Sequence, residues 1–187
     1  MRSLTTKSVL TLAFLVATAA SAATLAGVKL DDTASAGGQA LVLNGAAIRK
    51  KLFIKVYVAA LYLPAKQSNP AAILGGDTPR RMVMHFVFSV GKEKIAEAWQ
   101  EGLAANVPNA SADVKTNFAT LSSWMDDMKD GQQLSLTYVP GTGTTIEVNG
   151  KVKGTLAGKA TADAILSTWI GPKPGPGEDF KNGVLGK

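Results

Sequence analysis

The strongest hydrophobic pattern in the chain is the run from Leu52 to Leu63, which is rich in β-branched and aromatic residues. Its odd and even positions are both apolar, so both faces of an extended segment would be hydrophobic. This pattern is typical of a central strand that is covered on both sides. Pro64 follows and ends the run, because proline lacks the N–H that a strand ladder needs. We therefore predict a central strand over 52–63.

Segments on either side of this run predict a mixture of strands and helices. Alternating or β-branched segments predict strands at 27–30, 41–43, 81–88, 134–139, 144–148 and 151–156. Apolar residues three or four apart predict helices at 70–74, 92–106, 112–128 and 160–169. Two Asn-Gly pairs predict tight turns, at 44–45 and 149–150. The tail is expected to be extended over 172–177 and to dock apolar residues over 183–186.

The order of these segments is strands, helices, strands and a final helix, which argues for an α+β fold. We expect an antiparallel sheet with helices packed on one face, forming a sandwich with room for an apolar cleft. The sequence contains no internal repeat and no second core, so residues 23–187 are predicted to form a single domain.

The first 22 residues have the pattern of a secretory signal peptide. Arg2 and Lys7 give a positive start, residues 8–19 are apolar, and Ala20-Ser21-Ala22 has the small residues that signal peptidase accepts. The apolar run is shorter than the roughly 20 residues that span a bilayer. We therefore expect a periplasmic or secreted protein with no integral membrane segment after removal of 1–22.

Composition excludes several classes of site. The chain has no cysteine, so disulfides, zinc thiolates and a cysteine nucleophile are excluded. Its net charge is +6, but the basic residues are scattered, which argues against a nucleic-acid partner. His85 is the single histidine and is expected to be structural, so we expect no metal site and no cofactor. The oligomeric state is left open.

Four residues stand out as candidates for ligand binding: Arg49, Tyr57, Tyr62 and Thr168. A guanidinium at the rim of an apolar cleft would pair with a carboxylate or phenolate. If the strand has begun by position 49, Arg49 and Tyr57 share its odd face, and Tyr57 adds a hydroxyl donor. The alternative is that Arg49 caps a carbonyl or pairs with a surface carboxylate, while the tyrosines only pack.

An ordered set of short motifs resembles the chalcone isomerase-like family, especially its bacterial exported branch. The resemblance covers 41–186. The motifs are Asn44 to Lys51 running into Phe53 to Leu63; Trp99 with Gly102 and Asn106; Gly131; Gly141-x-Gly143; Asn149-Gly150-Lys151; Leu166 to Gly171; and Val184-Leu185-Gly186.

The resemblance implies an open-faced β-sandwich, in which a large antiparallel sheet is covered by helices with a cleft between them. In the plant enzymes that cleft cyclises a chalcone without a cofactor, whereas non-catalytic relatives bind fatty acids through an Arg and a Tyr. By this resemblance Thr168 falls on the enzymes' late active-site Thr, and Tyr57 replaces their strand Thr. Gly45 stands where their Arg stands, with Arg49 four residues later. Their helix Tyr and Asn are replaced by Glu93 and Gln100.

These departures favour binding over catalysis. We expect an exported, non-catalytic binder of a small amphiphilic acid such as a fatty acid, with Arg49 at the anionic head. Two alternatives stay open. One is a cofactor-free intramolecular lyase of the chalcone isomerase type, in which Tyr57 and Thr168 contact the enolate. The other is a structural or partner-binding periplasmic protein whose cleft is filled by its own side chains.

Overall fold

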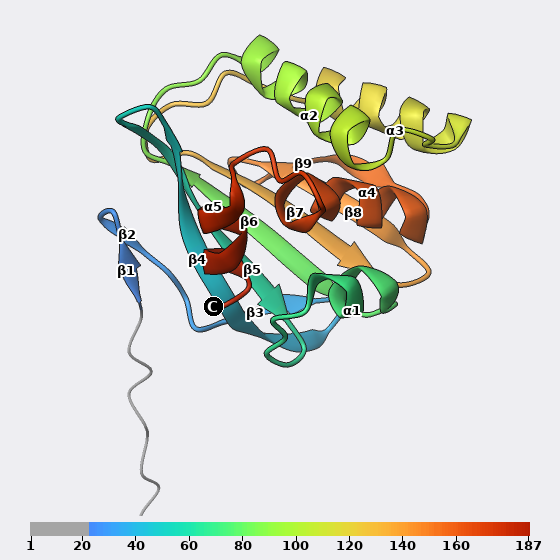
Figure 1. Ribbon diagram of the computed structural model, residues 1–187, viewed down its shortest axis with the longest axis horizontal. Coiled ribbons are helices and arrows are strands. Elements are labelled where there is room, and N and C mark those ends of the chain that lie inside the picture. The colour runs from blue at the N-terminus through green and yellow to red at the C-terminus, as the bar shows by residue number, and fades with distance from the viewer. Residues whose placement is uncertain (1–22) are drawn as a thin grey trace, which may run out of the picture.

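The computed structural model describes residues 23–187, and it consists of a curled antiparallel sheet with helices over one face (Figure 1). The predicted signal peptide at 1–22 lies outside the described residues. Within 23–187, the predicted α+β architecture with an antiparallel sheet under a layer of helices is confirmed.

The sheet has seven strands, and each strand pairs with the next one along the chain. They are β3 (Thr33–Ala36), β4 (Gln39–Lys51), β5 (Ile54–Leu63), β6 (Arg80–Phe86), β7 (Gln133–Val139), β8 (Gly143–Val148) and β9 (Lys151–Leu156). A separate hairpin is formed by β1 (Thr24–Leu25) and β2 (Val28–Lys29).

The helices are α1 (Pro70–Gly75), α2 (Lys92–Asn106), α3 (Ala112–Ser123), α4 (Lys159–Ile170) and α5 (Glu178–Val184). Helix α4 contacts β8, α5 lies on β4 and β5, and α2 packs against both α3 and α4. None of the described helices is long and apolar enough to cross a bilayer.

Strand β5 separates two hydrophobic cores, which confirms the prediction of a central strand with two buried faces. The strand begins at Ile54, and not at Leu52 as predicted, because Leu52 and Phe53 form the turn from β4. Ala59 and Leu61 point into the core beneath the helices, which we call the helix-side core. Val58 and Ala60 point the other way, into a second core. The second core is closed because the sheet curls until β3 contacts β6 and β7. Each face of β5 therefore removes apolar surface from water, as its two-sided pattern requires.

The predicted turn at Asn44–Gly45 is wrong, because both residues lie within β4. The pairing of β4 with β5 shifts there, between Leu43 and Gly45. The Asn44 side chain is buried and donates to the Val184 carbonyl of the last helix at 2.9 Å. Gly45 lies directly under the same helix, and the close approach requires a residue without a Cβ. A contact with a distant segment thus replaces the turn that an Asn-Gly pair normally forms.

One helix prediction needs correction at its end, and one helix was not predicted. Helix α3 stops at Ser123, and not at Met128, because Met128 leaves the helix to bridge Val90 in an antiparallel pair. The tail at 178–184 forms α5, which the residue pattern did not predict. The expected docking of the tail is confirmed, since Val184 and Leu185 are buried.

Candidate functional site

Arg49 and Tyr57 lie directly opposite each other on β4 and β5, at the end of the sheet near the turn between these strands. Directly paired residues of an antiparallel ladder point to the same face. Tyr57 packs against the helix-side core, with its ring 5.7 Å from that of Phe86 and 6.0 Å from that of Phe180 on α5. Arg49 and Tyr57 therefore share one face through cross-strand pairing. The single strand that the sequence predicted through both residues is not formed, because the chain turns at Leu52 and Phe53.

The hydroxyl of Tyr57 is held in one orientation by α4. The indole Nε1 of Trp169 donates a hydrogen bond to the Tyr57 Oη at 3.1 Å. Burial raises the pKa of Tyr57 to about 12, although the Trp169 hydrogen bond and the Arg49 charge both act to lower it. Tyr57 is therefore neutral at physiological pH and keeps its proton. Among residues 23–187 that proton has no hydrogen-bond acceptor, so it is available to a ligand.

Arg49 is half-buried at the rim of the helix-side core. Its guanidinium has neither a hydrogen bond nor an ion pair with any residue in the part of the chain that the structure describes. The capped carbonyl or surface carboxylate that the alternative interpretation requires is thus not found there. Arg49 and Tyr57 are cross-strand neighbours, and the Arg49 charge acts on the Tyr57 phenol. A cation beside a phenol O–H is a combination suited to a carboxylate.

The other two candidates do not join this pair. Tyr62 lies on the opposite face of β5, in the second core, where its hydroxyl donates to the Asp31 carbonyl at 3.0 Å. Thr168 is buried between α4 and α2, with its hydroxyl donating to the Ile165 carbonyl at 2.8 Å. A Cβ added to Gly102 of α2 would lie 2.8 Å from the Thr168 methyl group, so this residue forms the helix–helix contact. The group that the isomerase alternative needs beside Tyr57 is engaged elsewhere.

The residues that take the place of the enzymes' helix Tyr and Asn are also turned away. Glu93 is exposed in the first turn of α2. Gln100 is exposed and links α2 to α3 through its amide nitrogen, which donates to the Phe118 carbonyl and to the Ser122 hydroxyl.

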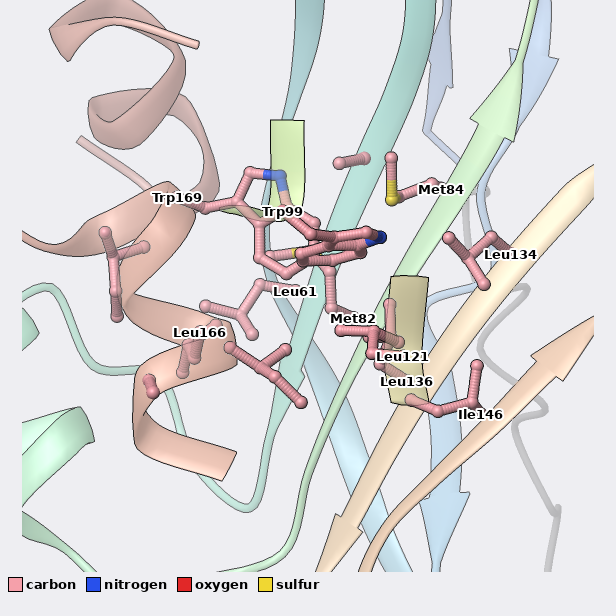
Figure 2. Close-up of a cluster of buried hydrophobic side chains, with 14 of the residues drawn as sticks. Leu61, Met82, Met84, Trp99, Leu121, Leu134, Leu136, Ile146, Leu166 and Trp169 are labelled. Atoms are coloured by element: carbon pink, nitrogen blue, oxygen red, sulfur yellow. The ribbon is translucent and has the colours of Figure 1, made fainter. Parts of the chain in front are cut away.

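The predicted cleft between the sheet and the helices is filled by side chains of the protein itself. Figure 2 shows Trp99 and Trp169 between the helices and the strand residues Leu61, Met82 and Met84. The two indole rings pack edge to face with their centroids 5.2 Å apart. The cavity that remains beneath α4 has a volume of about 20 Å³. That is room for about one water molecule, whereas ligand pockets typically measure about 300–1,000 Å³.

An ionic network around the buried Arg80, at the other end of α4, was not predicted from the sequence. Arg80 is 4% exposed, pairs with Asp163 at 2.5 Å, and lies 4.8 Å above the ring of Tyr138. Lys159 also pairs with Asp163, at 2.5 Å. Since the Arg80 charge is already neutralised, we interpret this network as the anchor of α4 on the sheet. The Arg80-Arg81 pair at the start of a strand gives no sequence signal that Arg80 anchors a helix.

His85 lies on the face of β6 that points away from the helices, beside an open groove of about 600 Å³. It is half-buried next to the Gln133 amide, and burial lowers its pKa. Lys29, Lys55 and Asp130 line the same groove. The groove is open and carries charges of both signs, so it offers no enclosed apolar volume for an alkyl chain.

Comparison with known proteins agrees with this architecture. The model of the chalcone isomerase-like family matches residues 22–186. Among solved structures, a fatty-acid binding protein of Arabidopsis thaliana is similar, with a TM-score of 0.66 and 16% sequence identity over 85% of this chain and 92% of that chain. No curated protein matches the chain. With a family model that matches nearly all of its described residues, the chain belongs to the chalcone isomerase-like family.

Proposed function

We propose that the protein is a non-catalytic binder of a small amphiphilic acid, such as a fatty acid. The observation that carries the proposal is the pairing of the half-buried Arg49 with Tyr57, where the Arg49 charge acts on the Tyr57 phenol. A carboxylate between them would accept a charge-assisted hydrogen bond from Arg49 and a second one from the proton of Tyr57. Since each donor lacks an acceptor in the described chain, neither loses an existing bond when the ligand enters.

The alkyl chain of the ligand would take the place of Phe180. This ring packs against Tyr57 and belongs to α5, the last helix of the chain. Because the space beneath α4 measures only about 20 Å³, a fatty acid does not fit without a rearrangement. Helix α5 has seven residues and follows the Pro- and Gly-containing segment 171–177, so it is the element that is displaced most easily. Binding would therefore be coupled to movement of α5.

Two further observations support this proposal. The fatty-acid binding protein of Arabidopsis shares the fold of this chain. The isomerase mechanism would need the Thr168 hydroxyl beside Tyr57, but this hydroxyl donates to the Ile165 carbonyl within α4. Our proposal places the protein in the periplasm or outside the cell, as a member of the exported branch of its family. Support for this placement comes from the signal-peptide pattern of residues 1–22.

The proposal is tested by calorimetric titration of delipidated protein with dodecanoate. Arg49→Ala should weaken binding by about tenfold to a hundredfold, because a hydrogen bond to a charged group contributes about 1.5–3 kcal/mol. Lys50→Ala is the matched control, since it removes a positive charge from the next residue, which is exposed. The proposal is wrong if the wild type does not bind, or if both variants bind dodecanoate as the wild type does.

The filled interior favours a second candidate function, a structural or partner-binding protein that takes no small ligand. The two functions differ in what they require of α5. Ligand binding requires that the backbone amides of α5 exchange hydrogen faster than those of β5, and that dodecanoate slows this exchange. A protein whose interior stays closed would protect α5 as well as the sheet, with or without the acid.

A further inference from the structure

The turn between β4 and β5 carries an exposed apolar tip. Leu52 and Phe53 form the turn, and they are 87% and 99% exposed. Ile54 follows at the start of β5 and is 46% exposed. Figure 1 shows this turn, in teal, projecting from the end of the sheet away from the body of the molecule. Isolated apolar residues are common on protein surfaces, but two consecutive large side chains at the apex of a hairpin are not explained by packing.

Leu52 adopts a backbone conformation in this turn that is unfavourable for leucine. Lys51 pairs with Ile54, which leaves Leu52 and Phe53 as a two-residue connection. Leu52 has a φ of 55°, in the left-handed region that glycine and asparagine occupy most readily. A leucine there is unfavourable for the local fold and gains nothing from burial. The presence of leucine at this position therefore points to a contact between its side chain and another molecule.

Positive charges surround the apolar tip. Lys50, Lys51 and Lys55 are all exposed, and residues 49–55 contain no acid. On the elements packed near this end, Glu97 of α2 already pairs with Lys94 at 2.7 Å. Asp130 shares the groove that Lys55 lines on the other face. The tip thus combines an apolar apex with a basic collar.

We propose that the β4–β5 tip docks on an anionic lipid surface, with Leu52 and Phe53 in the interfacial region and Lys50, Lys51 and Lys55 at the lipid phosphates. A basic collar around an apolar apex complements a surface whose negative headgroups lie above hydrocarbon. The small size of the tip favours lipid over a protein partner. A stable protein interface buries about 800 Å² on each side, which two residues at the apex of a hairpin do not provide.

The test uses a local probe, so that binding through any other part of the chain does not interfere. The chain has no cysteine, so Phe53→Cys introduces a single site for an environment-sensitive fluorophore. Val152→Cys is the matched control, because Val152 is 66% exposed on β9, at the far edge of the sheet. Each labelled protein is mixed with vesicles of phosphatidylcholine alone or of phosphatidylcholine with one quarter phosphatidylglycerol.

The label at position 53 should brighten several-fold and shift to the blue with the anionic vesicles only, while the label at position 152 stays unchanged. High salt or the double change Lys50→Glu with Lys51→Glu should abolish the response. An unresponsive label at position 53, or equal responses at both positions, would overturn the proposal. A response without vesicles that grows with protein concentration would overturn it too, since it would identify the tip as a contact between copies of the chain.

A second variant separates lipid docking from a structural role of Leu52. Leu52→Asn introduces a residue that adopts the left-handed backbone more readily than leucine. The melting temperature should therefore be unchanged or higher. Flotation with the anionic vesicles, measured against the same protein without the substitution, should show binding weakened by about tenfold. Unchanged flotation of Leu52→Asn would contradict the proposal.

Discussion

At the scale of single residues, the contacts made by glycines determine how the helices lie on the sheet. Gly45 touches the backbone of α5 at Gly183, and Gly102 receives the methyl group of Thr168. Both contacts join segments that are far apart in the sequence, so each depends on the absence of a Cβ. These two glycines therefore position α5 over β4 and α4 against α2.

The close contact at Gly45 leads to a prediction about stability. A Cβ at this position would overlap the Gly183 carbonyl oxygen. The next nearest atoms, the Gly186 nitrogen and the Val184 oxygen, also belong to the backbone and cannot move aside easily. Gly45→Ala should therefore push α5 off the sheet and destabilise the fold by about 2 kcal/mol or more. Chemical denaturation measures the change. Gly75→Ala is the control, because a Cβ there meets nothing within 4 Å, and its stability should be unchanged or higher by up to about 1 kcal/mol. Equal stabilities of the two variants would contradict the assigned contact.

The hydrogen bond from Trp169 to Tyr57 leads to a second prediction. Tyr57→Phe removes the acceptor and leaves the buried indole N–H without a partner, which costs about 1–3 kcal/mol. It also removes one of the two donors for the ligand carboxylate, so dodecanoate should bind more weakly than to the wild type. Thermal melts and calorimetric titration measure the two effects. If Tyr57→Phe binds dodecanoate as tightly as the wild type, the hydroxyl has no part in recognition.

At the scale of elements, α5 connects the fold to the proposed function. It covers the end of the helix-side core where Tyr57 lies, and it places Phe180 against that ring. Phe180 is 3% exposed, so the helix closes this end of the layer. A helix of seven residues has little stability of its own and depends on these contacts. This makes α5 the element whose displacement requires the least disruption of the sheet.

Removal of the Phe180 ring tests whether it occupies the place of the ligand's alkyl chain. Phe180→Ala should destabilise the protein by about 3–5 kcal/mol through the cavity it creates. Its affinity for dodecanoate should nevertheless rise, because the alkyl chain no longer has to displace the ring. Phe118→Ala is the matched control, since Phe118 is buried under α2 on the helix α3. It should lose similar stability without a gain in affinity. An affinity that is unchanged or lower in Phe180→Ala would contradict the assignment.

Elements that are specified by their own residue pattern were predicted well. Strand β5 and helix α2 follow from local periodicity. Arg49 and Tyr57 share one face as cross-strand partners on β4 and β5, and not, as their odd spacing predicted, along a single strand. Features that depend on distant contacts were not predictable in this way. The Asn44–Gly45 pair has the pattern of a turn, and only the approach of α5 keeps it inside β4. The filling of the cleft likewise depends on how Trp99 and Trp169 meet, which no local pattern determines.

At the scale of the whole molecule, the two cores make the fold sensitive to alkaline pH. The chain has three tyrosines, Tyr57, Tyr62 and Tyr138, and each has its pKa raised to about 12, with burial as the largest cause. In the unfolded chain a tyrosine ionises near pH 10. The unfolded state therefore loses protons first as the pH rises. The stability that these three tyrosines contribute is fully present below pH 10 and is lost between about pH 10 and 12.

Spectrophotometric titration of the phenolates tests this alkaline sensitivity. None of the tyrosines should ionise near pH 10 while the fold is intact, and all three should ionise together as the protein unfolds. Circular dichroism followed in parallel reports the fold. A phenolate that appears near pH 10 with an unchanged dichroism spectrum would show that at least one of these side chains is less buried than the structure indicates.

The most direct test of the central claim is an NMR titration of dodecanoate that carries ¹³C at its carboxyl carbon. We expect a bound signal that is separate from the free one. The pKa of the bound carboxyl should be lower than that of the free acid, because Arg49 stabilises the charged form. In Arg49→Ala that lowering should disappear. A single averaged signal that titrates like the free acid, or a bound signal that is identical in wild type and Arg49→Ala, would show that Arg49 does not bind the carboxylate.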